Sequence, residues 1–144
     1  MVSSAKPIAA LSLVLAMSLP AAARASTTFS VINNATTSYR IDGVNNPTLA
    51  LTRGQTYTFT IAATGHPFWI KTVASTGTAN AFNTGVTNNG IDNGTLTFIV
   101  PLNAPDTLHY DCEFHASMTG VLTISNPVPV VPQTWGKLKS RYVR

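Results

Sequence analysis

The chain has 144 residues and a single cysteine, which excludes an internal disulfide and leaves stability to a hydrophobic core. Its formal net charge of +4 comes from the two ends, because residues 26–125 hold three basic and five acidic side chains. This mildly acidic body lacks the basic surface stripe that nucleic-acid binding needs, so that class of function is excluded. About 100 residues are enough for one core of ordinary size.

Residues 1–25 have the features of a secretory signal peptide. A lysine at position 6 precedes an apolar run over 8–19, and PAAARAS then supplies small residues, with Ala23 and Ala25 at the cleavage positions. The run of about 12 apolar residues is shorter than the ~20 that a helix needs to span a bilayer, which favours a signal over a retained anchor. We therefore expect export, to the periplasm or the extracellular space.

Seven short segments after residue 25 have the pattern of β-strands. In 55–62 the apolar residues Tyr57, Phe59 and Ile61 alternate with threonines, which is the period of a half-buried strand. The candidate strands in chain order are 27–32, 48–51, 55–62, 68–73, 95–100, 108–112 and 120–125. Turn residues separate them and no stretch has a comparable helical periodicity, so the pattern predicts an antiparallel β-sandwich or barrel.

Two segments depart from this pattern. Residues 74–94 are rich in Gly, Asn and Thr and longer than an ordinary connection, so we expect an excursion with local turns and room for a short helix. Prolines at 127, 129 and 132 favour extended backbone and end the predicted domain at residue 125. The expected division is a signal peptide (1–25), one domain (26–125) and a Pro-rich linker with a basic tail (126–144).

The tail ends in TWGKLKSRYVR. On a helix Trp135, Leu138 and Tyr142 would share one side, with basic residues around them. So short a helix is unstable in water. The tail therefore either folds on a membrane surface or a partner, or stays disordered.

The lone cysteine lies in YDCEFHASMTG, residues 110–120. Cys112 precedes His115 by three residues, and His115 precedes Met118 by three. If 108–112 is a strand, Cys112 shares its inward face with a leucine and a tyrosine, and the turn that follows can bring His115 and Met118 to the same point. His66 in TGHPFWI also follows a strand, and it is the candidate for one further strong ligand.

Two imidazoles, a thiolate and a weak thioether form the ligand set of blue-copper electron-transfer sites. Zinc is the competing ion, but thioether is not among its usual protein ligands. Each residue also has a plain interpretation, with His66 as a turn residue, Cys112 as a small buried side chain and Met118 as core filler. Their joint spacing favours a metal site.

Residues 48–124 resemble the cupredoxin family, in its plastocyanin, pseudoazurin and amicyanin branch. GHPFWIKT is similar to the loop of the first histidine ligand, and LHYDCEFHASMTGVLTI to the last two strands and the ligand loop between them. The resemblance implies an all-β, Greek-key antiparallel β-sandwich of seven to eight strands that binds one type 1 copper. His66, Cys112 and His115 would be its equatorial ligands and Met118 the axial one.

The residue after the first histidine departs from the family pattern. Many cupredoxins have an asparagine or another polar residue there, which ties the two ligand loops together. This chain has Pro67, which offers neither an N–H group nor a polar side chain. Because outer hydrogen bonds tune a metal site, the reduction potential and the blue colour depend on this position more than metal binding does. Tyr110 and Gly120 do match the family's aromatic before the cysteine and its glycine after the loop.

The residues around the ligands have two interpretations each. The apolar neighbours either form a rim through which electrons leave at the His115 edge, as the resemblance suggests, or only pack locally. These neighbours are Pro67, Phe68, Phe114 and Ala116. His109, Asp111 and Glu113 fall on the strand face opposite Cys112, so we expect solvated polar side chains there, with a partner-docking patch as the alternative for the two carboxylates.

Together these features predict an exported, monomeric electron carrier that cycles one copper between Cu(I) and Cu(II) and exchanges electrons with redox partner proteins. The chain is not expected to be an enzyme, because a multicopper oxidase needs more histidines than the three present. One alternative is a copper-binding or copper-delivery module without a redox role. Another is a cupredoxin-like domain that serves adhesion or assembly.

Overall fold

The computed structural model describes residues 27–128, in which all regular structure is β-strand. The strands are β1 (Thr28–Asn34), β2 (Ser38–Ile41), β3 (Val44–Asn45), β4 (Leu49–Thr52), β5 (Thr56–Ala62), β6 (Phe68–Lys71), β7 (Val86–Thr87), β8 (Asn93–Ile99), β9 (Thr107–Cys112) and β10 (Thr119–Ser125). Within this range no helix could cross a membrane. The predicted signal segment, and the tail from residue 129 onward, lie outside the described residues.

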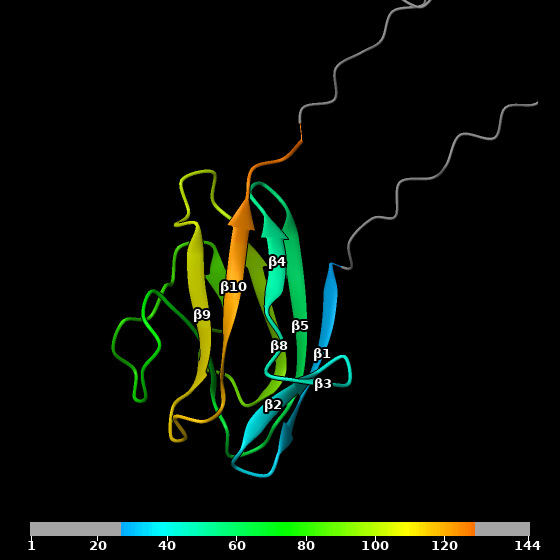
Figure 1. Ribbon diagram of the computed structural model, residues 1–144, viewed down its shortest axis with the longest axis vertical. Coiled ribbons are helices and arrows are strands. Elements are labelled where there is room, and N and C mark those ends of the chain that lie inside the picture. Colours follow the sequence, from blue (N-terminus) through cyan, green and yellow to red (C-terminus); the bar gives the residue numbers. More distant parts are fainter. Residues whose placement is uncertain (1–26, 129–144) are drawn as a thin grey trace, which may run out of the picture.

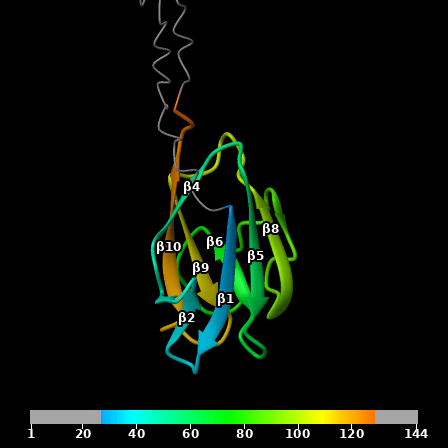
Figure 2. The ribbon, with the colours of Figure 1, turned by 90° about the vertical axis from the view of Figure 1, so that its right-hand side faces the viewer.

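Two sheets lie face to face and form a sandwich (Figures 1 and 2). One sheet has six strands in the order β3-β2-β1-β5-β8-β7, and the other has four in the order β4-β10-β9-β6. The predicted all-β sandwich is confirmed. Both sheets are mixed, because β1 runs parallel to β5 and β10 runs parallel to β4. The sequence had led us to expect antiparallel strands throughout.

All seven predicted strands are present, with ends shifted by a few residues. The sequence analysis missed β2, β3 and β7, of which two are only two residues long. Alternation explains the strands that were found, since Tyr57, Phe59 and Ile61 of β5 are buried and the threonines between them face outward. The missed strands have too few residues to show such a period.

Aromatic side chains fill the space between the sheets. Phe59 of the six-stranded sheet meets Phe68 of the four-stranded sheet with ring centroids 5.6 Å apart, and Phe68 stacks on Tyr110 at 5.3 Å. All three side chains are fully buried. Large rings that bridge two sheets contribute more buried apolar area than any other side chains, so this cluster holds the sandwich together.

The predicted excursion folds back over the outer face of β6 and β9. Bridges between Phe68 and Ile91 and between Lys71 and Ala81 tie it to the edge strand β6. The amide of Gly77 also donates to the carbonyl of Glu113 at 2.7 Å. The short helix for which the sequence left room does not form in 74–94, because the backbone groups of this segment bond to the sheet and in local turns instead.

This excursion buries two charged side chains that the sequence placed in solvent or left unassigned. Asp111 is only 3% exposed, so the expectation of a solvated or partner-docking carboxylate at this position is wrong. The buried ammonium of Lys71 donates to the carbonyls of Ser75 and Gly77, both at 2.6 Å, and so holds the excursion in place. Burial raises the pKa of Asp111 and lowers the pKa of Lys71, while the charge of each partly offsets the shift of the other.

Gly120 gives a direct test of how the sandwich closes. A side-chain carbon at this position would overlap the ring and hydroxyl of Tyr110, whose hydroxyl donates to the carbonyl of Pro47 at 2.7 Å. Gly120→Ala should therefore displace the ring and weaken that bond, and we expect it to lower the free energy of unfolding of the copper-free protein by about 1–3 kcal/mol. Urea denaturation measures this loss. An unchanged midpoint would show that the Tyr110 ring moves aside without cost.

Candidate metal centre

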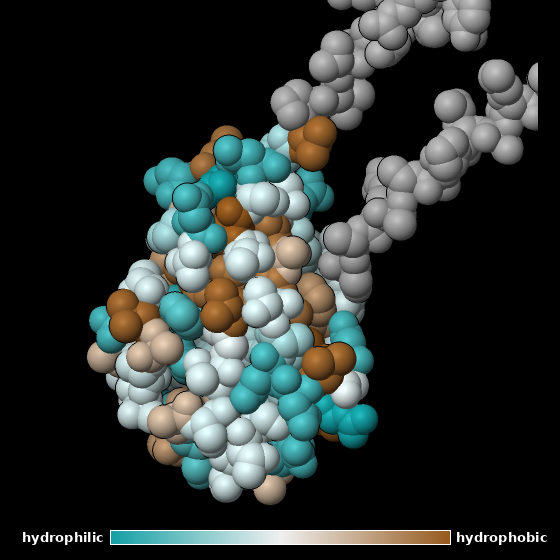
Figure 3. Space-filling model, in the orientation of Figure 1, coloured by the Kyte–Doolittle hydropathy of each residue, from teal (hydrophilic) through white to brown (hydrophobic). Residues whose placement is uncertain are grey.

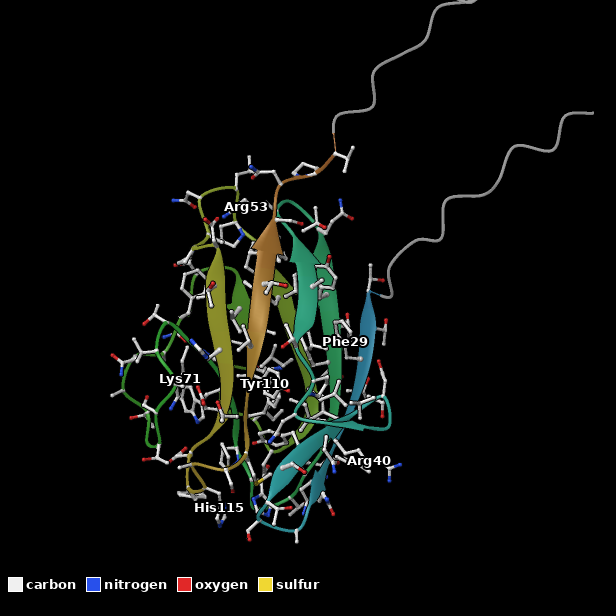
Figure 4. The ribbon with its side chains drawn as sticks, viewed as in Figure 1. Phe29, Arg40, Arg53, Lys71, Tyr110 and His115 are labelled. Carbon is white, nitrogen blue, oxygen red and sulfur yellow. The ribbon has the colours of Figure 1, made fainter. Side chains whose placement is uncertain are left out.

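The predicted ligands come from two loops at one end of the sandwich. His66 lies in the turn between β5 and β6, Cys112 ends β9, and His115 and Met118 lie in the loop before β10. Figure 4 shows His115 at this end and Arg53 at the opposite end. Gly65 makes the first turn possible, because its φ of 82° suits glycine, and the amide of His66 closes the turn on the carbonyl of Ala63 at 2.8 Å.

Three of the four predicted ligands converge. The Nδ1 atoms of His66 and His115 are 3.2 Å apart, and the sulfur of Cys112 lies 3.8 Å from the first and 3.6 Å from the second. Cys112 is fully buried, while both histidines are half-buried. Cys112 at the end of β9 and His115 in the loop after it thus meet a histidine that lies 46 and 49 positions earlier in the chain.

The spacing of these three atoms fits a single ion between them. An ion about 2.0–2.1 Å from each nitrogen and about 2.3 Å from the sulfur would hold the nitrogens roughly 3.3–3.6 Å apart and each nitrogen roughly 3.5–3.8 Å from the sulfur. The separations in the structure, 3.2, 3.6 and 3.8 Å, lie within about 0.1 Å of those ranges. One imidazole nitrogen from each histidine and the Cys112 sulfur can therefore hold one metal ion without a large movement of either loop.

Met118 closes the ligand loop. Its amide donates to the carbonyl of His115 at 3.0 Å, and its carbonyl accepts from the amide of Cys112 at 2.9 Å. Its side chain is fully buried. These bonds hold the backbone of all three loop ligands in one tight turn. The role of Met118 as axial ligand stays a prediction.

The electrostatics of His66 suit metal binding. Burial, and after it the neighbouring His115, lowers the pKa of His66 below its ordinary value. At neutral pH this imidazole is therefore uncharged, which is the form that binds a metal. The ring centroids of the two histidines lie 4.8 Å apart, and the ring planes are tilted by 42°.

The two ligand loops are tied together in spite of Pro67. Its carbonyl accepts a bond from the amide of Glu113 at 3.2 Å and another from the hydroxyl of Tyr39 at 3.0 Å. The carbonyl of His66 lies 2.8 Å from the same hydroxyl, so the two carbonyls share its one proton. The link that the sequence analysis found missing is thus made through a backbone acceptor instead of a side chain after the first histidine.

Tyr39 is a residue beside the site that the sequence analysis missed. Its side chain is fully buried, and burial, followed by the neighbouring Cys112, raises its pKa far above the ordinary value, so the hydroxyl keeps its proton. The signal for it was the alternation of Tyr39 and Ile41 in SYRI, where both side chains face inward on β2. A four-residue segment between two turns gave that period too little length to stand out.

The apolar neighbours of the ligands divide into two groups. Phe114 is 60% exposed and Ala116 is exposed as well, whereas Phe68 is fully buried and belongs to the core. Phe68 is therefore not part of an exposed apolar rim, whereas Phe114 and Ala116 can be. Elsewhere on the face shown in Figure 3, apolar residues lie as separate patches among neutral and polar ones.

Comparisons with known proteins find structural likeness without close sequence relatives. No family model and no curated protein matches the chain. A structure of reduced rusticyanin matches with 20% identity and a TM-score of 0.50, over 71% of this chain and 82% of the other. Rusticyanin from Thiobacillus ferrooxidans (22% identity, TM-score 0.48, 70% and 79% covered) and a purple cupredoxin from Nitrosopumilus maritimus (18%, 0.46, 69% and 100%) also match. The first likeness shows a shared fold.

Proposed function

We propose that this chain, which has the cupredoxin fold, binds one type 1 copper ion and carries single electrons by cycling it between Cu(I) and Cu(II). The observation that carries the proposal is the convergence of His66, Cys112 and His115 at metal-ligand spacing. With Met118 as a weak axial ligand, this is the donor set of blue-copper sites. Rusticyanin, whose fold is shared, is itself described as a copper protein.

The chain holds the ligand loops in place, keeps water from the sulfur and offers a route for electrons. The closed turn from Cys112 to Met118 and the bond from Glu113 to Pro67 fix both ligand loops, so that the donors need little rearrangement between oxidation states. Burial of Cys112 keeps water from the sulfur. His115 is half-buried, which leaves part of its ring at the surface as the point where electrons enter or leave. Copper, when bound, supplies the redox couple.

The proposal includes a redox partner and export. Phe114 beside His115 is 60% exposed and offers an apolar contact for a partner protein at the metal end. The signal-like segment 1–25 supports a site of action in the periplasm or outside the cell. The number of ligands supports an electron carrier rather than an enzyme, because one copper with four protein ligands leaves no open position for a substrate.

Met118→Gln tests the redox role. A soft thioether favours Cu(I) and a harder amide oxygen favours Cu(II), so the substitution should lower the reduction potential while copper stays at one per chain. Each tenfold shift of affinity toward Cu(II) lowers the potential by about 59 mV. Cyclic voltammetry of the copper-loaded wild type and variant measures the shift.

Two other results would count against this proposal. A wild-type protein that takes up copper but gives no reversible couple would favour a copper-delivery module. A variant with an unchanged potential and a large loss of copper-free stability would make Met118 core filler instead of a ligand, since a buried amide without a partner is destabilising by about 1–3 kcal/mol.

A further inference from the structure

The segment 36–47, which runs from the end of β1 through β2 and β3 toward β4, contacts both ligand loops. We call it the brace and define it by four of its residues, Thr36, Tyr39, Asn46 and Pro47. Its bonds reach the first histidine loop, the loop between His115 and Met118, and the strand that carries Cys112. In Figure 1 the strands β2 and β3 lie beside the lower end of the sandwich, the same end at which Figure 4 places His115.

Tyr39 forms the contact with the first histidine loop. Its hydroxyl lies 2.8 Å from the carbonyl of His66 and 3.0 Å from the carbonyl of Pro67, and its one proton is shared between them in a three-centre bond. The ring is held independently, since it packs edge-on against Phe68 with centroids 4.9 Å apart. The hydroxyl is therefore not needed to fill the core, and its bonds act on the position of the loop.

Asn46 and Thr36 form the contact with the second loop. The side-chain amide of Asn46 donates to the carbonyl of Ser117 at 2.8 Å, and the hydroxyl of Ser117 donates to the carbonyl of Thr36 at 2.7 Å. The side-chain oxygen of Asn46 also accepts a bond from the backbone amide of Tyr39 at 2.9 Å, and the backbone amide of Asn46 donates to the carbonyl of Tyr39 at 2.8 Å. The two contacts are thus coupled through Asn46, whose φ of 44° is one that asparagine tolerates.

We propose that the brace sets the geometry of the metal centre, with the hydroxyl of Tyr39 as the positioning residue for the His66 loop and Asn46 as the positioning residue for the loop of His115. Pro67 has no side-chain donor that could tie the two ligand loops together. The brace ties them instead, because Tyr39 holds the carbonyl of Pro67 where the amide of Glu113 donates to it. The inference rests on the proposed copper function. It goes beyond it by assigning control of the site to residues that touch no metal.

The first test compares Tyr39→Phe with Tyr57→Phe in the copper-loaded protein. Tyr57 is buried like Tyr39, and its hydroxyl also bonds to backbone, accepting from the amide of Thr52 at 2.9 Å, but its strand begins at the end far from the ligands. Tyr39→Phe should shift the charge-transfer maximum and the reduction potential, and it should weaken copper binding roughly tenfold. Tyr57→Phe should leave all three as in the wild type. Equal behaviour of the two variants would overturn the proposal.

The second test needs no metal. In the copper-free protein, Tyr39→Phe should speed hydrogen exchange of the Glu113 amide roughly tenfold, because the acceptor on Pro67 loses its second anchor. Tyr57→Phe should instead speed exchange of the Thr52 amide and leave Glu113 unchanged. If wild-type protein with Cu(II) shows no charge-transfer band, the copper function fails, and this exchange experiment still decides whether the brace holds the loops.

Asn46→Asp provides a variant that keeps the shape of the side chain. The acceptor for the Tyr39 amide remains, but the donor to the Ser117 carbonyl is replaced by an oxygen. We expect the Met118 amide, which closes the same loop, to exchange faster and copper to dissociate faster, each by roughly tenfold. Unchanged exchange and dissociation in this folded variant would contradict the role of Asn46, and the same result in Tyr39→Phe would contradict the brace as a whole.

Discussion

Cys112→Ser is expected to abolish the visible absorption of the copper-loaded protein. The colour of a blue-copper site comes from charge transfer between a thiolate sulfur and Cu(II), and this chain has one sulfur of that kind. Its side chain is fully buried between two imidazoles, at 3.6 and 3.8 Å from their nearest nitrogens. A serine oxygen has nearly the same shape but is a harder donor, so the strong band should be lost and not merely shifted.

Absorption spectra of both proteins, titrated with Cu(II), measure this effect. Ala104→Ser is the matched control, because it places the same hydroxyl at a buried small residue in the segment between β8 and β9, before the long strand that leads to the metal centre. That variant should keep the full band. A wild-type protein that binds one copper without a strong visible band would contradict the type 1 assignment, and so would a band that survives in Cys112→Ser.

The second large effect concerns stability. Copper that binds only the folded protein should raise the free energy of unfolding by RT ln(1 + [L]/Kd), which is about 4.1 kcal/mol when copper is present at a thousand times its Kd. His66→Ala should remove most of this increment, because His66 is the proposed ligand that joins the two loops. The copper-free variant should unfold almost as the wild type does, since a half-buried turn side chain contributes little to the core.

Thermal and urea unfolding with and without copper measure the increment. His109→Ala is the control, because it removes the remaining histidine of the chain, which is half-buried on β9 and outside the cluster. It should retain the full copper effect. Retention of the effect in His66→Ala, together with its loss in His109→Ala, would move the ligand to His109 and overturn the loop assignment.

The part of the molecule that could be predicted is the part that local patterns encode. Strand β5 could be predicted because its apolar residues alternate with polar ones. The ligand loop could be predicted because a thiol, an imidazole and a thioether follow one another at three-residue spacing. His66 was chosen as the partner of that loop because it follows a strand on a separate loop and because the resemblance implies a first histidine ligand there. Its ring nitrogen does lie 3.2 Å from that of His115.

The features that could not be predicted depend on contacts between distant segments. The parallel pairings of β1 with β5 and of β10 with β4 leave no local trace, because a strand has the same side-chain period whichever way its neighbour runs. The burial of Asp111 depends on the beginning of the excursion, where Ala74 and Ser75 lie beside it although they come more than 30 positions earlier in the chain. Tyr39 acts on carbonyl groups, and backbone acceptors carry no residue identity that a sequence could reveal.

The course of the last two strands determines how the protein can be attached to something else. β9 leads to Cys112, β10 carries the chain back, and residues 126–128 leave the sandwich at the end where Arg53 lies, opposite to His115 (Figure 4). The seven residues of β10 cover about 23 Å at the usual rise of a strand. A fusion partner or an electrode linker joined at this point holds the protein with His115 facing outward. An attachment at residues 126–128 suits assays with a soluble partner. Direct electron transfer to an electrode instead requires an attachment beside Phe114, at the end where His115 lies.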